Sequence, residues 1–278
     1  MSAVEMHLPG RPLAVAAPAA EVRTWRDLTF VFLALFAVTL GVYAIDERLL
    51  HGISVWIKPL KFQASLALHF ATLALLAELL PAARRRTRGF RAVVSISAAA
   101  GLFEIGWIML QAARGRASHF NDQTVLEMVM YGLMGVGAVL LVAAPFIMGI
   151  MLLRDRGRTM RGDPLLAGAT LGLIVSAVMT LVVAGYLSTT GSHWVGDVTS
   201  DAGGLPLFGW SQQVGDLRVP HFFATHAMQL LPLAGLALQG AGKRGSFYVA
   251  VAGGTYLLFI VAVFVQALQG KPFLVLGG

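Results

Sequence analysis

The sequence predicts an all-α integral membrane protein, a bundle of about seven transmembrane helices. Of its 278 residues, 57% are hydrophobic and only 13% are charged, whereas a soluble domain carries about 25% charged residues. Seven apolar stretches of roughly 20 residues follow one another, and that length crosses a hydrocarbon core of about 30 Å. The stretches lack the polar–apolar alternation of barrel strands, so we expect helices to satisfy their backbone groups in lipid.

The elements follow from these stretches in chain order. Residues 1–24 are predicted to form a disordered cytoplasmic tail, because the first strong apolar run begins too late for a cleavable signal peptide. Residues 25–278 are predicted to form a single transmembrane helical domain. Its helices are expected at Leu28–Ile45, Leu60–Leu80, Ala92–Ala112, Thr124–Leu153, Leu165–Ser188, His221–Leu238 and Ser246–Leu268.

The connection at residues 189–220 is longer than the 12–15 residues beyond which loops are usually functional or disordered. Aromatic side chains such as Trp194 and Trp210 argue against disorder, because they can pack onto a bundle. We therefore expect a folded lid over the outer mouth of the bundle. Within the lid, Asp216 and Arg218 are expected to pair.

Basic residues predict the orientation in the membrane. With a cytoplasmic N-terminus, the inner segments hold 14 of the 21 Lys and Arg residues and the outer segments hold 7. The positive-inside rule therefore places the N-terminus in the cytoplasm and the C-terminus outside. Seven-helix rhodopsins have the opposite orientation, and Lys271 lies beyond the last predicted helix, so a retinal Schiff base is not expected.

Composition excludes several kinds of function. The chain has no cysteine, which rules out disulfides, iron–sulfur clusters and thiolate metal sites. Its net charge of +7 arises from short clusters between apolar runs, and these are not interleaved with aromatic residues as in nucleic-acid-binding surfaces. The lipid bilayer is therefore the expected macromolecular partner, and nucleic acid is not.

Three ionisable residues within predicted helices form the candidate catalytic and metal-binding site: His69, Glu104 and His226. A charge at the bilayer centre costs at least about 2.5–3.5 kcal/mol, so such residues usually face the bundle interior and have a partner. A rise of 1.5 Å per residue places them roughly 8–14 Å below the outer ends of their helices. If these helices face one another, the three side chains line a cavity that opens outward.

Such a site suits three chemistries. Haem b could be held between His69 and His226, or a non-haem metal ion could bind His69, Glu104 and His226. A transporter could instead use Glu104 and His69 as a proton or ion relay. A hydrogen-bonded His–Glu pair that only stabilises packing remains a fourth possibility.

Polar residues at the outer ends of the helices are candidates for binding a small-molecule ligand. Lys58 and Lys61 in WIKPLKF either anchor the helix at the interface or receive a carboxylate or phosphate group together with Arg218. His221 and His226 lie about 140° apart on their helix, so they have separate roles, and Gln229 is placed to orient His226. The expected ligand-binding residues are Lys58, Lys61, His119, Asp216, Arg218, His221 and Gln229.

The motifs WIKPLKF, ARGRASHFN and GDLRVPHFFATHAMQ resemble a family of uncharacterised bacterial multi-pass membrane proteins. This resemblance implies a bacterial cytoplasmic (inner) membrane and carries no activity. The residues themselves favour a membrane-embedded oxidoreductase or a metal- or haem-dependent protein with a His/Glu site in the outer half of the bundle. The alternatives are a transporter or channel for a small anionic solute and, third, a sensor or assembly factor, so whether the protein is an enzyme stays open.

Overall fold

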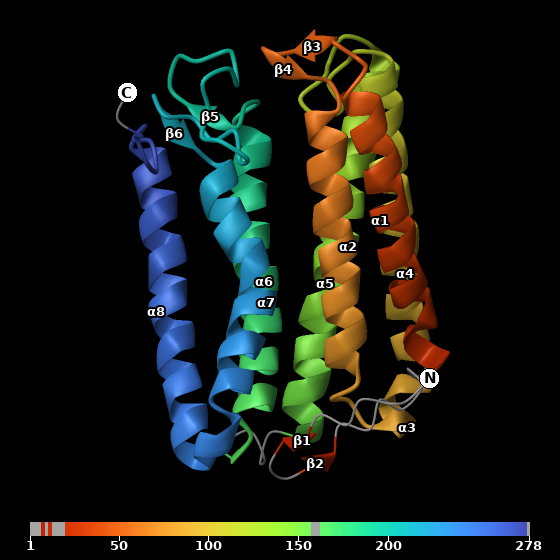
Figure 1. Cartoon of the computed structure of the whole chain (residues 1–278), viewed down its shortest axis with the longest axis vertical. Coiled ribbons are helices and arrows are strands. Elements are labelled where there is room, and N and C mark those ends of the chain that lie inside the picture. The colour runs from red at the N-terminus through yellow and green to blue at the C-terminus, as the bar shows by residue number, and fades with distance from the viewer. Residues whose placement is uncertain (1–6, 9–10, 13–19, 157–161, 277–278) are drawn as a thin grey trace.

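The structure of the protein is a computed structural model, and the residues that it describes are 7–8, 11–12, 20–156 and 162–276. In these residues, eight helices carry the fold (Figure 1). Their bounds are α1 Arg23–Tyr43, α2 Ile57–Ala77, α3 Ala82–Arg85, α4 Arg88–Ala113, α5 Val125–Arg156, α6 Pro164–Thr189, α7 Arg218–Ala237 and α8 Gly242–Leu268. Three two-residue antiparallel pairs accompany them: β1 His7–Leu8 with β2 Arg11–Pro12, β3 Leu49–Leu50 with β4 Ile53–Ser54, and β5 Trp194–Val195 with β6 Gly215–Asp216.

Each predicted helix coincides with a long helix of the structure, with small differences at the ends. Within the described residues, six helices are long and apolar enough to cross a membrane, and α7 is not among them. The α1 helix begins at Arg23, inside the predicted tail, after a 3-10 turn at Ala20–Val22. Residues 1–6, 9–10 and 13–19 of that tail lie outside the described residues. The α7 helix begins at Arg218, three residues before the predicted start at His221.

Capping residues explain where two helices begin. Thr87 precedes α4 and its hydroxyl accepts a hydrogen bond from the Phe90 amide at 3.2 Å. Asp163 precedes α6 and accepts from the Leu166 amide at 3.0 Å, with Pro164 as the first helical residue. Both contacts satisfy amides that the helix leaves without a backbone partner.

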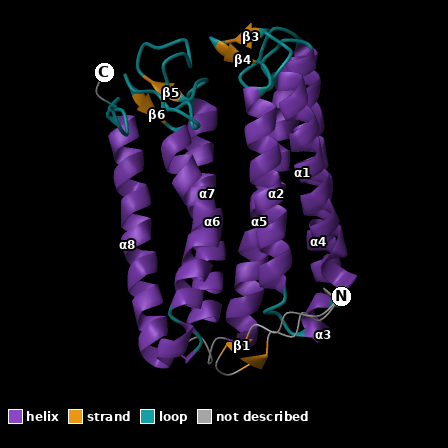
Figure 2. Cartoon of the chain, in the orientation of Figure 1, coloured by secondary structure: helices purple, strands orange, loops and turns teal. Residues whose placement is uncertain are grey.

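The long helices form two side-by-side groups, α1–α2–α4–α5 and α6–α7–α8, which meet where α5 packs against α6 (Figures 1 and 2). Within the second group, α6 and α7 approach closely. A Cβ added at Gly172 would lie 2.7 Å from the carbonyl oxygen of Ala227, and one at Gly168 would collide with the carbonyl of Leu231. Small residues thus bring these two backbones together, as in other membrane bundles.

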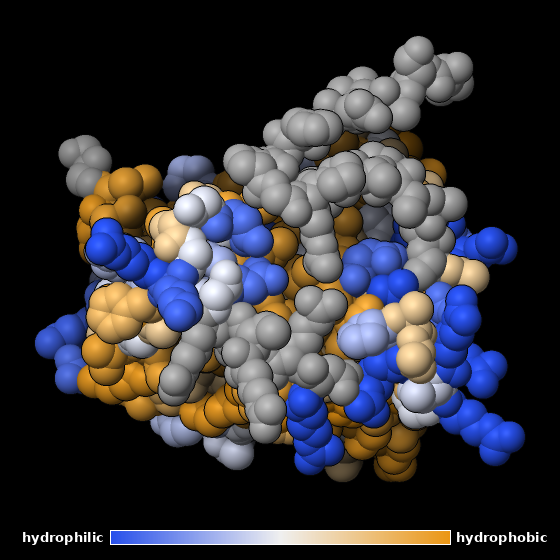
Figure 3. Space-filling view, turned by 90° about the horizontal axis from the view of Figure 1, so that it is seen from below, coloured by the Kyte–Doolittle hydropathy of each residue, from blue (hydrophilic) through white to orange (hydrophobic). Residues whose placement is uncertain are grey.

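The two ends of the bundle differ in character. One end carries the β3–β4 hairpin and the loop at residues 190–217, and the other carries α3 (Figure 1). At the α3 end, hydrophilic side chains gather on a face whose flanks are hydrophobic (Figure 3). Large apolar residues such as Phe30, Leu75 and Leu258 are exposed along the sides of the helices. This distribution is that of a protein whose helical sides contact lipid.

Candidate functional site

The polar side chains of α2 lie along one stripe of the helix. At 100° per residue, five of them fall within an arc of about 80°. The exception is Gln63, which donates a hydrogen bond to the hydroxyl of Thr39 on α1 at 2.8 Å. The stripe consists of Lys58, Lys61, Ser65, His69 and Thr72.

The contacts of this stripe show that it faces the second helix group. The loop at residues 190–217 corresponds to the predicted lid, and the end of the bundle that carries it is called the lid end. Near this end, Lys61 Nζ donates to the carbonyl oxygen of Phe208 in the loop at 2.6 Å. Farther along, Gln229 Nε2 of α7 donates to Thr72 Oγ1 at 3.0 Å. We call this boundary the α2–α7 seam. It comprises the stripe of α2 together with Arg218, His226 and Gln229 of α7.

A cluster of charges lies at the lid end of the seam. The Arg218 guanidinium binds Asp216 through Nε at 3.0 Å and Nη2 at 2.7 Å, and it contacts Asp201 at 2.7 Å. The expected Asp216–Arg218 pair is therefore present, and the Asp216 side chain has no exposed surface. Lys58 and Lys61 are both close enough to interact electrostatically with Arg218 and Asp201. These five residues form the mouth cluster, which holds three cations and two carboxylates.

The loop that covers the mouth is tied to both helix groups. It contacts α2 through Lys61 and is anchored on α7 by Arg218, which also donates to the carbonyl of Gly209 at 2.9 Å. The amide of Asp201 donates to the carbonyl of His51, beside the β3–β4 hairpin, at 2.9 Å. The loop therefore lies across the boundary between the groups at this end.

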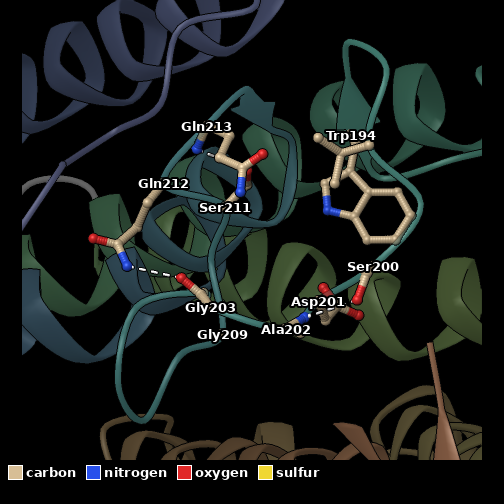
Figure 4. Close-up of a pocket in the computed structure, with 11 residues that line it drawn as sticks. Trp194, Ser200, Asp201, Ala202, Gly203, Gly209, Ser211, Gln212 and Gln213 are labelled. Carbon is tan, nitrogen blue, oxygen red and sulfur yellow. Dashed lines mark hydrogen bonds between the residues drawn. The ribbon is translucent and has the colours of Figure 1, made fainter. Parts of the chain in front are cut away.

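A hollow within the loop is too small for a solute. Figure 4 shows it between Trp194, Asp201 and Gln212, with Gln212 Nε2 donating to the Gly203 carbonyl at 2.8 Å. Its volume is about 10 Å³, room for roughly one water molecule. We therefore place the candidate ligand site at the mouth cluster rather than in this hollow.

His193 contacts the mouth cluster through Asp201. Its Nε2 lies 3.2 Å from Asp201 Oδ1. Burial lowers the pKa of His193, more than the hydrogen bond to Asp201 raises it. Burial raises the pKa of the Asp201 carboxyl, but the bonds from His193 and Arg218 outweigh this effect and lower it. At neutral pH, a neutral His193 therefore donates to an ionised Asp201.

His119 lies beside the mouth, in the connection between α4 and α5. Its ring centroid is 6.0 Å from those of Phe62 and Tyr131, and its Nδ1 is 3.1 Å from Ser118 Oγ. Burial, together with the positive charge of Lys58, holds the pKa of His119 well below its usual range. His119 is thus a neutral, aromatic neighbour of Lys58.

Deeper in the first helix group, Glu104 of α4 is buried without a hydrogen-bond partner. The residue is 2% exposed, and its Oε1 atom has no donor nearby. The carboxyl group packs against Gly137 of α5, where an added Cβ would lie 2.5 Å from Oε1. Its charge interacts with that of Lys58. His69 also has a buried ring nitrogen, Nε2, that makes no hydrogen bond.

On α7, His226 is held in place by its neighbours. Its Nδ1 lies 3.2 Å from Gln229 Oε1, the contact expected from their spacing, and its ring centroid is 4.2 Å from that of Phe222. Gln229 in turn donates a hydrogen bond to Thr72, so a hydrogen-bonded chain joins α7 to α2. His221 is close enough to His226 to interact with it electrostatically.

The structure does not bring His69, Glu104 and His226 together as metal ligands. Among the described residues, no group of three or more His, Asp or Glu side chains could hold a metal ion. Glu104 packs against α5, whereas His226 is bonded to Gln229 and stacked on Phe222. The three residues therefore have different neighbours, although their helices belong to one bundle.

Sequence reasoning missed three contributors to the site. The role of Thr72 was visible in the 3–4 residue spacing of the α2 stripe, which continues from Lys58 through His69. Two other contacts had no signal in the sequence. One is the packing of Glu104 against Gly137, and the other is the hydrogen bond from Lys61 to the Phe208 carbonyl. Both depend on how distant segments pack.

Comparisons with known protein families, with curated proteins and with solved structures find no match to this chain. The arrangement of its side chains therefore has to support any functional assignment.

Proposed function

We propose that this chain is a seven-helix transporter that carries a small anionic solute across a bacterial cytoplasmic membrane. The observation that supports it best is the polar stripe of α2, which begins at a cationic mouth and faces α7. Polar residues are costly in a bilayer and commonly mark the path of a solute or ion. The resemblance of the WIKPLKF and related motifs supports the choice of membrane.

The proposed topology has seven spans, a cytoplasmic N-terminus and an outside lid. The α7 helix falls short in hydropathy, yet it packs along α6 through the contacts of Gly168 and Gly172. Its polar residues Arg218, His226 and Gln229 lie at the seam, and a helix in a bundle can keep such residues away from lipid. The excess of basic residues at the α3 end supports a cytoplasmic location for that end.

The charge balance of the mouth cluster supports an anion as the solute. Its three cations exceed its two carboxylates by one positive charge. Lys61 and Lys58 present ammonium groups, which bind carboxylate, phosphate or halide without demanding one geometry. Arg218 is already paired with Asp216 and Asp201, so the lysines are the groups that contact the solute.

The length of the stripe supports transport rather than binding alone. Thr72 follows Lys58, the first residue of the stripe, by 14 positions, which is about 21 Å along the helix. This distance is most of a hydrocarbon core of about 30 Å. The stripe also lies between the two helix groups, and relative movement of such groups is the usual means of alternating access.

The test is solute flux in proteoliposomes loaded with chloride, acetate or inorganic phosphate. We expect at least one of these anions to move, and we expect Lys58→Gln and Lys61→Gln each to reduce its flux by about tenfold or more. Lys271→Gln is the matched control, because Lys271 is an exposed lysine beyond the end of α8. Equal flux in all four proteins, or no flux of any anion in the wild type, would contradict the proposal.

A metal- or haem-dependent oxidoreductase is the second candidate. It is favoured by His69 Nε2 and Glu104 Oε1, which are two of five buried side-chain polar atoms without a hydrogen-bond partner among the described residues. A buried polar atom without a partner calls for an explanation, and a role as a metal ligand would be one. It ranks second because these residues and His226 do not form a metal-binding group among the described residues. Elemental analysis for iron, copper, zinc and manganese, with an absorption spectrum for a Soret band, tests it directly.

A further inference from the structure

We infer that Lys58 links anion binding at the mouth to protonation of Glu104, so that one proton accompanies each anion. The inference rests on the proposed transport function and names its coupling ion. Three observations carry it: the burial of Glu104, its interaction with Lys58, and the charge balance of the mouth cluster.

Glu104 has the surroundings of a carboxyl group that exchanges a proton. It is 2% exposed and Oε1 accepts no hydrogen bond, so the ionised form lacks the donors that usually stabilise a buried carboxylate. Glu127 shows the contrast: it is equally buried, but it pairs with Arg116 at 2.9 Å and accepts from Gln111. The contacts of Glu127 stabilise its ionised form, and Glu104 lacks such contacts.

Lys58 connects Glu104 to the mouth cluster. Its charge interacts with those of Glu104, Arg218 and Asp201. Among the described residues it forms no salt bridge with Glu104, so the interaction acts through space rather than through a bond. The Lys58 ammonium lies 5.9 Å from the centroid of the Phe62 ring, one helical turn farther along α2.

The charges balance in two states. With Glu104 ionised, the six groups carry three positive and three negative charges. An anion that binds Lys58 adds a negative charge, and protonation of Glu104 removes one. A buried site strongly disfavours an uncompensated charge, so the anion and the proton favour each other's binding.

Other ionisable groups near Glu104 are neutral or paired in different contacts. On α2, His69 Nε2 is buried and makes no hydrogen bond, and His119, which follows α4, is held neutral by burial. On α5, the contact is Gly137, and Glu127 is paired with Arg116. The ionisable residues of α1 lie at its ends, at Arg23, Arg26, Asp27 and Tyr43.

The proton transfer is simple to balance. A proton from water at the mouth joins the Glu104 carboxylate to give the carboxylic acid, and it leaves to water on the opposite side. No bond of the anion forms or breaks. By thermodynamic reciprocity, the anion binds more tightly when Glu104 is protonated, and couplings of this kind are typically about 5- to 150-fold.

The first experiment follows the carboxyl group itself and needs no solute. Infrared spectra of the purified protein in nanodiscs are recorded across pH, and the Glu104 carboxylic-acid band is identified by its absence in Glu104→Gln. We expect Lys58→Gln to raise the pH of half-protonation by about one unit or more, because it removes the neighbouring positive charge. Lys58→Arg and Lys271→Gln are expected to leave that pH close to wild type.

The second experiment measures transport. Glu104→Gln has a permanently neutral side chain, so it is expected to exchange the anion across the membrane but to lose accumulation driven by a pH gradient. Glu78→Gln, which changes a carboxylate paired with Arg85 at the α3 end, is the matched control and should keep both activities. Size-exclusion profiles identify any variant that fails to fold, and the Lys58 variants leave Glu104 intact.

The outcomes separate the two proposals. If the wild type transports an anion but the pH of half-protonation of Glu104 is unchanged in Lys58→Gln, the linkage is contradicted and the transporter proposal is not. A shift without flux of any anion contradicts the transporter and leaves the Lys58–Glu104 interaction standing. Accumulation driven by a pH gradient in Glu104→Gln would overturn the assignment of the proton to this residue.

Discussion

At the scale of single residues, the contact between Glu104 and Gly137 gives the carboxyl group its position. The Glu104 side chain occupies the space that a side chain on α5 would fill. Gly132 and Gly135 of α5 differ, because an added Cβ at either would meet nothing within 4 Å. The role of Gly137 is therefore specific to its site.

The first prediction compares the effects of alanine at Gly137 and at Gly135. In Gly137→Ala, the new methyl group displaces the Glu104 carboxyl in a well-packed interior, at an expected loss of about 1–3 kcal/mol in the free energy of unfolding. Gly135→Ala should change that free energy by no more than about 1 kcal/mol. Denaturation of both variants in detergent measures the difference, and equal stabilities would show that the contact is not close.

The second prediction concerns His193, which lies in the lid. Its pKa is lowered by burial from the usual value of about 6.5. Because the pKa is lower in the folded state than in the unfolded state, the stabilisation from neutral His193 is complete above about pH 6.5. It is lost as the pH falls through the lowered pKa.

Trp194 reports this titration, since its ring centroid lies 4.0 Å from that of His193. We expect acidification to quench its fluorescence, with a midpoint below 6.5, because a protonated imidazole quenches a nearby indole. Subtracting the pH profile of His193→Gln isolates this signal from the other tryptophans. A midpoint at or above 6.5 would contradict the burial of His193.

At the scale of elements, a hydrogen bond between polar side chains joins α2 to α7. The chain His226–Gln229–Thr72 joins them at the end of the seam that lies away from the mouth cluster. By contrast, α6 and α7 are joined by close backbone packing at Gly168 and Gly172. Opening the first boundary breaks the hydrogen bond from Gln229 to Thr72, whereas opening the second would expose packed backbone.

The third prediction tests the contact between Thr72 and Gln229 by a double-mutant cycle. We expect Thr72→Val and Gln229→Leu to show a coupling energy of about 0.6 kcal/mol, the average for hydrogen bonds between membrane helices. The cycle Thr39→Val with Gln63→Leu, inside the first helix group, is the control for a buried bond of similar geometry. A coupling energy of zero for Thr72 and Gln229 would mean that the seam is not closed by this bond.

At the scale of the whole molecule, the two helix groups are connected at the lid end by side chains and backbone carbonyls. Lys61 reaches the loop at Phe208, and Asp201 joins it to His51. Asp201 also binds Arg218 of α7. Movement of the groups at this end therefore requires the lid to release at least one of these contacts.

The fourth prediction tests the seven-span topology, and the absence of cysteine from the chain makes it direct. Single cysteines replace three exposed alanines, Ala83, Ala202 and Ala241. A membrane-impermeant maleimide added to intact cells should label Ala202→Cys, and should label the other two only after the membrane is permeabilised. Labelling of Ala241→Cys in intact cells would mean that α7 does not cross the membrane.

The sequence by itself determined the helices and part of the site. Apolar length and helical capping act within a short segment, so the seven helices and the Thr87 and Asp163 caps could be predicted from local residues. The spacing of Lys58, Lys61 and Thr72 on one face of α2 is also a local property.

Only the tertiary structure decided which neighbours those residues have. Depth along a helix follows from residue number, but the rotation of each helix about its axis depends on packing with the others. Hence the expected grouping of His69, Glu104 and His226 as metal ligands did not appear among the described residues. For the same reason, the contact of Glu104 with Gly137 could be found only in the folded bundle.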